Sequence, residues 1–68
     1  MLAREELKAV WRAVETLSHK QRAVFLLRFV EEMSLEEIAQ ATRSKIGTVK
    51  IHLFRAVGAV RRKLKEQQ

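Results

Sequence analysis

Apolar residues recur along the first quarter of the chain at the spacing expected of an α-helix. They lie three positions apart, with one adjacent pair, and so form a single stripe on a helix of 3.6 residues per turn. This pattern predicts a helix over residues 3–16. The stripe consists of Leu7, Val10, Trp11, Val14 and Leu17.

A second helix is predicted over residues 19–31. Ser18 and Gln21 have the spacing of a capping box, in which the hydroxyl accepts from the third helical amide and the glutamine side chain reaches back to the cap. Apolar residues cover most of the circumference of this helix, which favours a central place in a bundle. The alternative is a protein-binding groove that exposes Phe25 or Phe29.

A short third helix is predicted over residues 35–42. Ser34 and Glu37 form a second potential capping box, and Met33 and Ile38 have the spacing of a hydrophobic staple. We expect Ile38 to face inward. A break in the helical pattern follows at residues 43–45.

The longest predicted helix covers residues 46–64. At 100° per residue its apolar side chains fall within one narrow arc, which we expect to be buried. We expect the last four residues, 65–68, to fray. The arc consists of Ile46, Val49, Leu53, Ala56, Val57, Val60 and Leu64.

The composition agrees with an all-α fold. The chain lacks Pro, Asp, Asn and Tyr and has only two glycines, so most residue types that favour β-turns are missing. Its 68 residues suffice for one small domain over residues 1–68, and it has no cysteine for a disulfide. Because it has neither an apolar run of about 18 residues nor a signal peptide, we expect a soluble cytoplasmic protein.

The net charge of +6 is confined to the C-terminal third of the chain. Residues 1–42 carry 6 basic and 7 acidic side chains, a balance of −1, whereas residues 43–68 carry 8 basic and 1 acidic, a balance of +7. This asymmetry indicates an anionic partner. Nucleic acid is the commonest such partner, and a membrane surface is the alternative.

A short helix, a break and a longer amphipathic helix, supported by preceding helices, have the layout of a DNA-binding helix-turn-helix. The sequence therefore predicts a four-helix domain with a winged-helix-like three-helix core and no wing. We expect the basic face of the last helix to bind double-stranded DNA. The candidate DNA-binding residues are Lys45, Gly47, Thr48, Lys50, Ile51, His52, Phe54, Arg55 and Arg62.

These residue types suit a DNA groove for separate reasons. Gly47 lets the backbone approach a phosphate, and Thr48 can donate to the same group. Lys50 and Arg55 can reach phosphates or the acceptors of guanine, while Ile51 can contact a thymine methyl group. The alternatives are that Gly47 is merely tolerated at a helix start and that Ile51 and Phe54 pack on a neighbouring helix or on an absent domain.

Three stretches of the chain resemble the fourth conserved region of extracytoplasmic-function (ECF) sigma factors of RNA polymerase. They are residues 17–28 (LSHKQRAVFLLR), residues 34–39 (SLEEIA), and residues 47–50 (GTVK) with 53–56 (LFRA). Where members of this family usually have Gly, an apolar residue and Ser before the last helix, this chain has Arg43, Ser44 and Lys45.

The resemblance implies a domain that places its last helix in the major groove of the −35 promoter element. By motif position, Lys50, Ile51, Phe54 and Arg55 would contact bases and backbone, with Thr48 on a phosphate. The resemblance also implies docking on the β flap of RNA polymerase, with an anti-sigma factor as a possible further partner. An upstream domain that reads the −10 element would be missing, so we expect the chain to be a fragment or an isolated domain.

Two other readings remain open at this point. A LuxR-type response-regulator domain also carries a helix-turn-helix with a Thr-Val-Lys sequence, and a helical protein-interaction module would explain the apolar second helix. An enzyme is not expected, because no paired carboxylate, nucleophile or glycine-rich phosphate loop is evident. We likewise expect no metal site, no cofactor and no small-molecule substrate.

Overall fold

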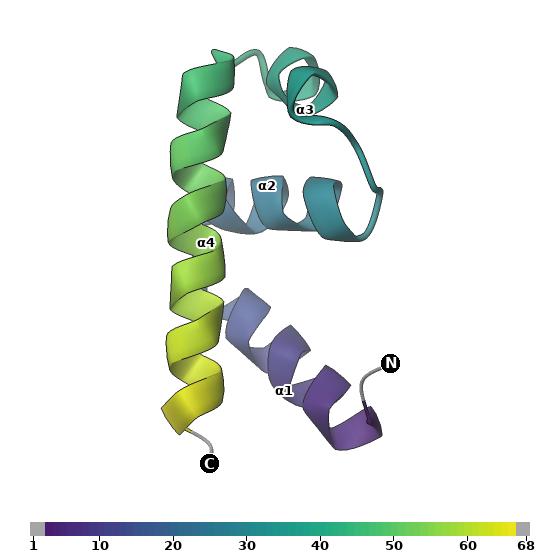
Figure 1. Cartoon of the computed structure of the whole chain (residues 1–68), viewed down its shortest axis with the longest axis vertical. Coiled ribbons are helices and arrows are strands. Elements are labelled where there is room, and N and C mark those ends of the chain that lie inside the picture. Colours follow the sequence, from purple (N-terminus) through teal and green to yellow (C-terminus); the bar gives the residue numbers. More distant parts are fainter. Residues whose placement is uncertain (1–2, 67–68) are drawn as a thin grey trace.

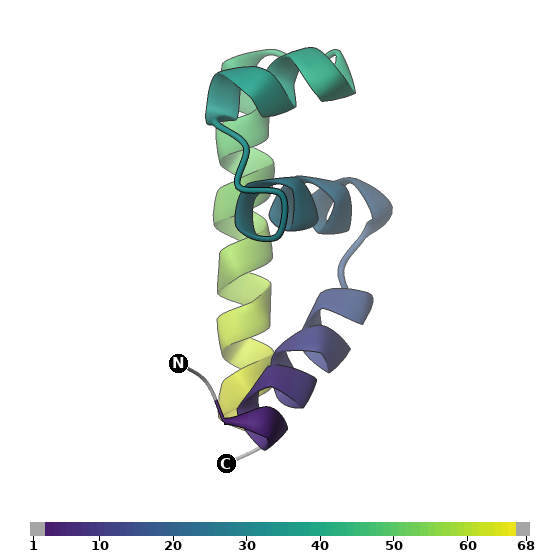
Figure 2. The same ribbon diagram turned by 90° about the vertical axis from the view of Figure 1, so that its right-hand side faces the viewer.

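The computed structural model describes residues 3–66, which form four α-helices and no strand (Figure 1). The longest helix, α4, runs along the long dimension of the molecule, which measures 36 × 20 × 15 Å. The other three lie along it in reverse chain order, with α3 at its start, α2 at its middle and α1 near its end (Figures 1 and 2). The prediction of an all-α, four-helix fold is confirmed. The helices are α1 (Arg4–Glu15), α2 (His19–Phe29), α3 (Leu35–Thr42) and α4 (Ile46–Glu66).

The ends of three helices differ from the predicted ends. Helix α1 is one residue shorter at each end than predicted. Helix α2 stops at Phe29 instead of residue 31, because the chain turns: Glu32 has a positive φ of 56°, and the Arg28 guanidinium donates to the Met33 carbonyl at 2.9 Å. Helix α4 continues to Glu66, so the expected fraying is wrong for residues 65 and 66, while residues 67 and 68 lie outside the described part.

The C-terminal half of α4 packs against α1 and α2 in one apolar cluster. Because α1 and α4 lie side by side there only over part of their length, α1 does not bury its whole apolar stripe. Leu7 is 47% exposed and Trp11 is 44% exposed, so these two members of the predicted stripe are not buried. The buried residues of this cluster are Ala13, Val14, Leu17, Ala56 and Val60.

The N-terminal half of α4 packs against α2 and α3 in a second cluster. Ile38 and Val49 are fully buried at its centre, and Val24 joins them from α2. Leu53 and Met33 pack around this centre, as the predicted arc and staple require. Ile46 lies at the start of α4, beyond the reach of this cluster, and is 37% exposed, contrary to prediction.

Helix α2 joins the two clusters, as its apolar circumference predicts. Val24 belongs to the cluster near α3, whereas Phe25 and Leu26 pack against the cluster near α1. The central placement is therefore confirmed. Its last turn is different, since Phe29 remains 53% exposed.

Both predicted helix caps form. The capping box at Ser34 has both of its hydrogen bonds, whereas the one at Ser18 has only one. The Ser34 hydroxyl accepts from the Glu37 amide at 3.1 Å, and the Glu37 carboxylate accepts from the Ser34 amide at 2.8 Å. The Ser18 hydroxyl accepts from the Gln21 amide at 3.3 Å, but the Gln21 side chain does not return the bond, so that box is incomplete. The hydrogen bonds from Ser34 lower the pKa of Glu37 from its ordinary value of 4.5.

Removal of the complete cap gives a first prediction. Ser34→Ala should destabilise the domain by about 1 kcal/mol, the usual cost of losing a serine cap. Since the pKa of Glu37 is lowered in the folded state, its contribution is present above pH 4.5 and is lost as the pH falls through the folded value. Thermal melts at pH 7 and pH 3 measure both effects. Glu37→Gln, which keeps the bond without the charge, should melt with less pH dependence than the parent protein.

Candidate nucleic-acid interface

Helix α4 presents an exposed face opposite its buried residues. Val49, Ala56 and Val60 are buried against the other helices, which turns the opposite side of α4 to solvent. Most of the predicted DNA-binding residues lie on this side within the first three turns, and Lys45 is exposed directly before them. The exposed members in these turns are Gly47, Thr48, Lys50, Ile51, Phe54 and Arg55.

Two of these exposed residues are apolar. Ile51 is 52% exposed and Phe54 is 81% exposed, three positions apart on the same helix. The alternative that they pack on a neighbouring helix of this domain is therefore wrong. Large apolar side chains on a basic surface indicate a contact surface, because water solvates them poorly.

The cations of this face are not neutralised by neighbouring carboxylates. Among residues 3–66, the one ion pair within 4.0 Å joins Lys63 to Glu66 at 3.6 Å, near the end of α4. Arg55 and Arg62 remain exposed, with Arg62 two turns further along the helix. The face therefore keeps its positive charge for an outside anion.

The start of α4 is open to a close approach. A Cβ placed on Gly47 would meet no heavy atom within 4 Å, so the fold itself does not require glycine there. Ser44, two residues before α4, donates its hydroxyl to the Thr42 carbonyl at 3.3 Å. Ile46, Gly47 and Thr48 are exposed, so the first turn of α4 is accessible from outside.

The turn before α4 depends on an unusual backbone conformation. Arg43 has φ 55° and ψ 41°, the left-handed region in which glycine is most at ease. Arginine thus adopts here a conformation that costs glycine little and a residue with a side chain more. The conformation lets the Ser44 amide donate to the Ala39 carbonyl at 2.9 Å and so end α3.

This turn gives a second prediction. Arg43→Gly should raise the free energy of unfolding by up to about 1 kcal/mol, because it relieves the left-handed strain of a side chain. For a domain of this size the gain corresponds to roughly 4–8 °C in Tm. Arg43→Ala removes the same charge but keeps the strain, so it serves as the control in thermal melts. Equal melting temperatures for the two variants would contradict the explanation.

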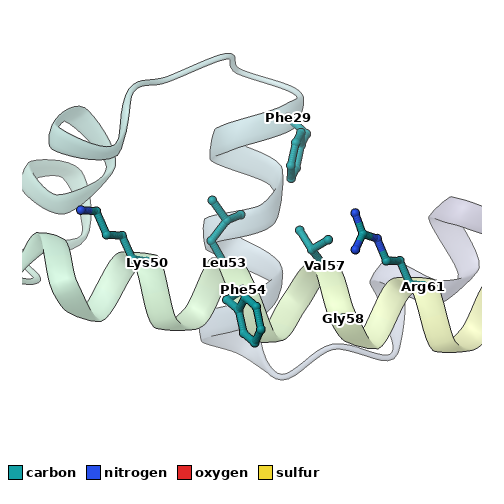
Figure 3. A pocket seen from close by; sticks show the side chains of 7 residues that line it. All are labelled: Phe29, Lys50, Leu53, Phe54, Val57, Gly58 and Arg61. Atoms are coloured by element: carbon teal, nitrogen blue, oxygen red, sulfur yellow. The ribbon is translucent and has the colours of Figure 1, made fainter.

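An apolar groove lies on one flank of α4 (Figure 3). We call it the Phe29 groove; its volume is about 410 Å³. Phe29 from the end of α2 points toward Val57, whereas Phe54 lies across α4 and away from Phe29. Lys50 and Arg61 stand at its two ends. It is lined by Phe29, Lys50, Leu53, Phe54, Val57, Gly58 and Arg61.

The two phenylalanines proposed for protein contact divide between core and surface. The ring of Phe25 is half-buried and packs against the core, with its centroid 4.7 Å from that of Phe29. Phe29 is exposed and forms a wall of the groove. The structure thus offers Phe29, rather than Phe25, to a partner.

A second cavity lies on the opposite flank of α4, where the chain brings together three segments. We call it the histidine pocket; its volume is about 320 Å³. His52 is half-buried in it instead of standing on the exposed face with the other candidate residues. Thr48, another sequence candidate, also lines it, whereas His19, Lys20, Thr42, Arg43 and Ser44 were not among the candidates. The lining is His19, Lys20, Ala23, Val24, Thr42, Arg43, Ser44, Thr48, Val49 and His52.

Two features of residues 3–66 bear on other functions. No group of three or more His or Glu side chains in this range is placed to hold a metal ion. No helix in the same range is long and apolar enough to cross a membrane.

Comparison with known proteins identifies the family. The sequence model of "Sigma-70, region 4" matches residues 7–64. The chain is 36% identical over 55 residues to RNA polymerase sigma factor SigV of Bacillus subtilis, covering 81% of this chain and 33% of that protein. It is 46% identical over 52 residues to RNA polymerase sigma-E factor of Streptomyces antibioticus, covering 76% and 29%.

A third relative covers nearly the whole chain. The ECF RNA polymerase sigma-E factor of Escherichia coli is 36% identical over 64 residues, which are 94% of this chain and 34% of that protein. The chain thus spans about a third of the length of the curated relatives it matches. These matches give no support to the response-regulator alternative. The family model matches most of the chain, and the structure is all-helical. The chain therefore belongs to the sigma-70 region 4 family.

Proposed function

We propose that this domain binds the −35 element of bacterial promoters by placing the start of α4 in the major groove. The observation that carries the proposal is the exposed pair Ile51 and Phe54 beside Arg55, which forms no ion pair with any residue of 3–66. Affinity then comes mostly from cations on phosphates, and discrimination comes from a few side chains on base edges. The names of the relatives, all RNA polymerase sigma factors, support this assignment.

The dimensions of the helix suit this mode of binding. The 21 residues of α4 span roughly 30 Å at 1.5 Å per residue. The major groove is about 12 Å wide and admits one helix. The first half of α4, with α3 beside it, would enter the groove, while the second half stays covered by α1.

The individual roles follow from the exposed chemistry. Arg55 can bind guanine with two hydrogen bonds, and Ile51 can contact a thymine methyl group. Lys50 and Thr48 reach phosphates on either side of the helix, and Gly47 allows the backbone to come close to one of them. Lys45 and Arg62 extend the positive surface beyond the first turns.

We assign the Phe29 groove to core RNA polymerase, on the β flap, with an anti-sigma factor as a competitor for the same surface. The groove joins an exposed aromatic ring to the apolar residues Leu53 and Val57, with Lys50 and Arg61 at its ends. An apolar helix with acidic flanks would fit it. The domain then acts in the cytoplasm as a binding module without catalytic chemistry, and promoter opening depends on other parts of the sigma factor.

Binding is tested by fluorescence anisotropy with a selected −35-like duplex and a scrambled duplex of equal length, each at two salt concentrations. We expect tighter binding to the −35-like duplex. The slope of log K against log salt should be about −4 to −5, corresponding to four to six phosphate contacts. Equal binding to both duplexes would overturn direct reading by α4, and no binding at low salt would overturn the DNA-binding proposal.

The polymerase assignment gives a third prediction. Phe29→Ser should weaken binding to core RNA polymerase by about tenfold, as expected for loss of an aromatic contact residue. DNA affinity should remain unchanged, because Phe29 lies away from the exposed face of α4. Since Phe29 is already exposed, the fold should tolerate serine. A pull-down with core RNA polymerase measures the change. Trp11→Ser, which removes a 44% exposed aromatic ring from α1, is the control.

A further inference from the structure

Helix α1 carries two large apolar side chains that the rest of the domain leaves half exposed. Leu7 is 47% exposed and Trp11, one turn further along, is 44% exposed, whereas Ala13 and Val14 are buried in the core. Among the described helices, α1 packs only on α4 and α2, and it lies at the end of the molecule away from α3 (Figures 1 and 2). A partner that removes Leu7 and Trp11 from water gains free energy from their burial.

Charged residues extend this apolar pair toward both ends of α1. At about 100° per residue, three of them fall on the same side of the helix as Leu7 and Trp11, within an arc of about the same width. All three are exposed, and the one ion pair of residues 3–66 involves none of them. We call this surface the outer strip of α1. It consists of Arg4, Leu7, Lys8, Trp11 and Glu15.

The charges at the two ends of the outer strip oppose the dipole of α1. The N-terminus of a helix favours carboxylates, and its C-terminus favours cations. Arg4 is the first residue of α1 and Glu15 is the last. Each therefore stands at the end that disfavours it, so the stability of α1 does not explain either residue.

A second copy of the outer strip supplies the missing partners. If two α1 helices lie antiparallel with Arg4 of one opposite Glu15 of the other, the twofold symmetry forms this ion pair twice. The same register places Lys8 opposite Trp11, where a lysine can lie over the indole ring. Each Glu15 then lies beside the N-terminus of the other helix, where the dipole favours a carboxylate. The strip is therefore complementary to itself.

The charge distribution of the chain also favours this place of contact. The chain has a net charge of +6, but residues 3–16 carry three basic and three acidic side chains. Helix α1 packs on the buried side of α4, so the exposed basic face of α4 points away from it. Two copies that meet through α1 leave both basic faces free and bring no net charge together at the contact.

We propose that two copies of this domain form a symmetric dimer through the outer strip of α1. The inference does not depend on the proposed DNA-binding function, because it uses a different surface. Each copy contributes one helix of 12 residues, so the interface is small. We therefore expect a weak dimer, with a Kd of about 0.1 mM.

Sedimentation equilibrium of the 68-residue chain tests the proposal. Between about 10 µM and 1 mM, the weight-average mass should rise from near 7.9 kDa towards twice that value. Trp11→Ser should keep the monomer mass over the same range, and circular dichroism checks that it remains helical. A constant mass of 7.9 kDa for the parent chain would overturn the proposal.

Charge reversal tests the antiparallel register. Arg4→Glu and Glu15→Arg each place like charges opposite one another twice, so each should raise the Kd of the dimer about tenfold. The double variant Arg4→Glu, Glu15→Arg restores both ion pairs and should return the Kd to within about threefold of the parent value. Both single changes agree with the dipole of α1, so weaker association does not reflect loss of the helix.

The control for charge reversal is Glu5→Arg. It changes the net charge as much as Glu15→Arg does, at an exposed position of α1 outside the outer strip. The Kd should stay close to that of the parent chain. A double variant that associates no better than the single variants, or a control that associates as poorly as they do, would overturn the proposed register.

Trp11 itself reports where the two copies meet. It is the one tryptophan of the chain, and its burial in the dimer should shift its fluorescence emission to shorter wavelengths as the concentration rises. Glu5→Arg should show the same shift, whereas Arg4→Glu should show little. A chain that dimerises without a change in this emission uses another surface, such as the Phe29 groove, and this result would also overturn the proposal.

Discussion

Val49→Asp is expected to unfold the domain. Val49 is fully buried against Val24 and Ile38, so a carboxylate there would be removed from water among apolar side chains. The cost of burying an unpaired charge is several kcal/mol. A domain of this length has a total stability of about 3–10 kcal/mol. The helical signal in circular dichroism at 25 °C should fall to that of an unfolded chain.

Ile51→Asp is the matched control for this change. It introduces the same carboxylate two residues further along the same helix, where the side chain is 52% exposed. The helical signal should persist, while DNA binding is lost because a negative charge faces the phosphates. A folded Val49→Asp variant would show that the buried face of α4 is misassigned.

Arg55→Ala should weaken binding to the preferred duplex by about 1 to 3 kcal/mol, or roughly 5- to 150-fold. The reason is the loss of a bidentate contact from an exposed guanidinium that no carboxylate of residues 3–66 neutralises. The measurement is anisotropy on the preferred and the scrambled duplex. The loss should be larger on the preferred one if Arg55 reads a base.

Two results would change the role of Arg55. An equal loss on both duplexes would assign it to a phosphate, and no loss on either would remove it from the interface. Arg12→Ala serves as the control, since it removes an equal charge from the exposed surface of α1. It should lower both affinities only slightly, through long-range attraction.

The local elements follow from sequence because their causes are local. The cap at Ser34 and Glu37 lies within four residues, and it sets the start of α3 as predicted. The 3.6-residue period of α4 likewise places Val49 inward and Ile51 outward without knowledge of the partner helices. The exposed face that we assign to DNA is therefore largely readable from the sequence, although its contacts with bases remain predictions.

The exposure of some apolar side chains depends on how far a neighbouring helix extends over them. Periodicity gives the direction of Leu7 and Trp11 but not whether a neighbour is long enough to cover them, and both are exposed. The same holds for Phe29, whose exposure follows from the early end of α2. Only the packing of α1 and α2 along α4 decides these cases.

The histidine pocket shows the same division most clearly. The sequence alone determined the four helices, their caps, the inward face of α4 and the basic face opposite it, because each depends on residues within a few positions of one another. Only the tertiary structure decided that His19 lines the same pocket as Arg43 and His52, since His19 is more than thirty positions from His52 in the chain and approaches it through the packing of α2 on α4. No local pattern encodes that meeting.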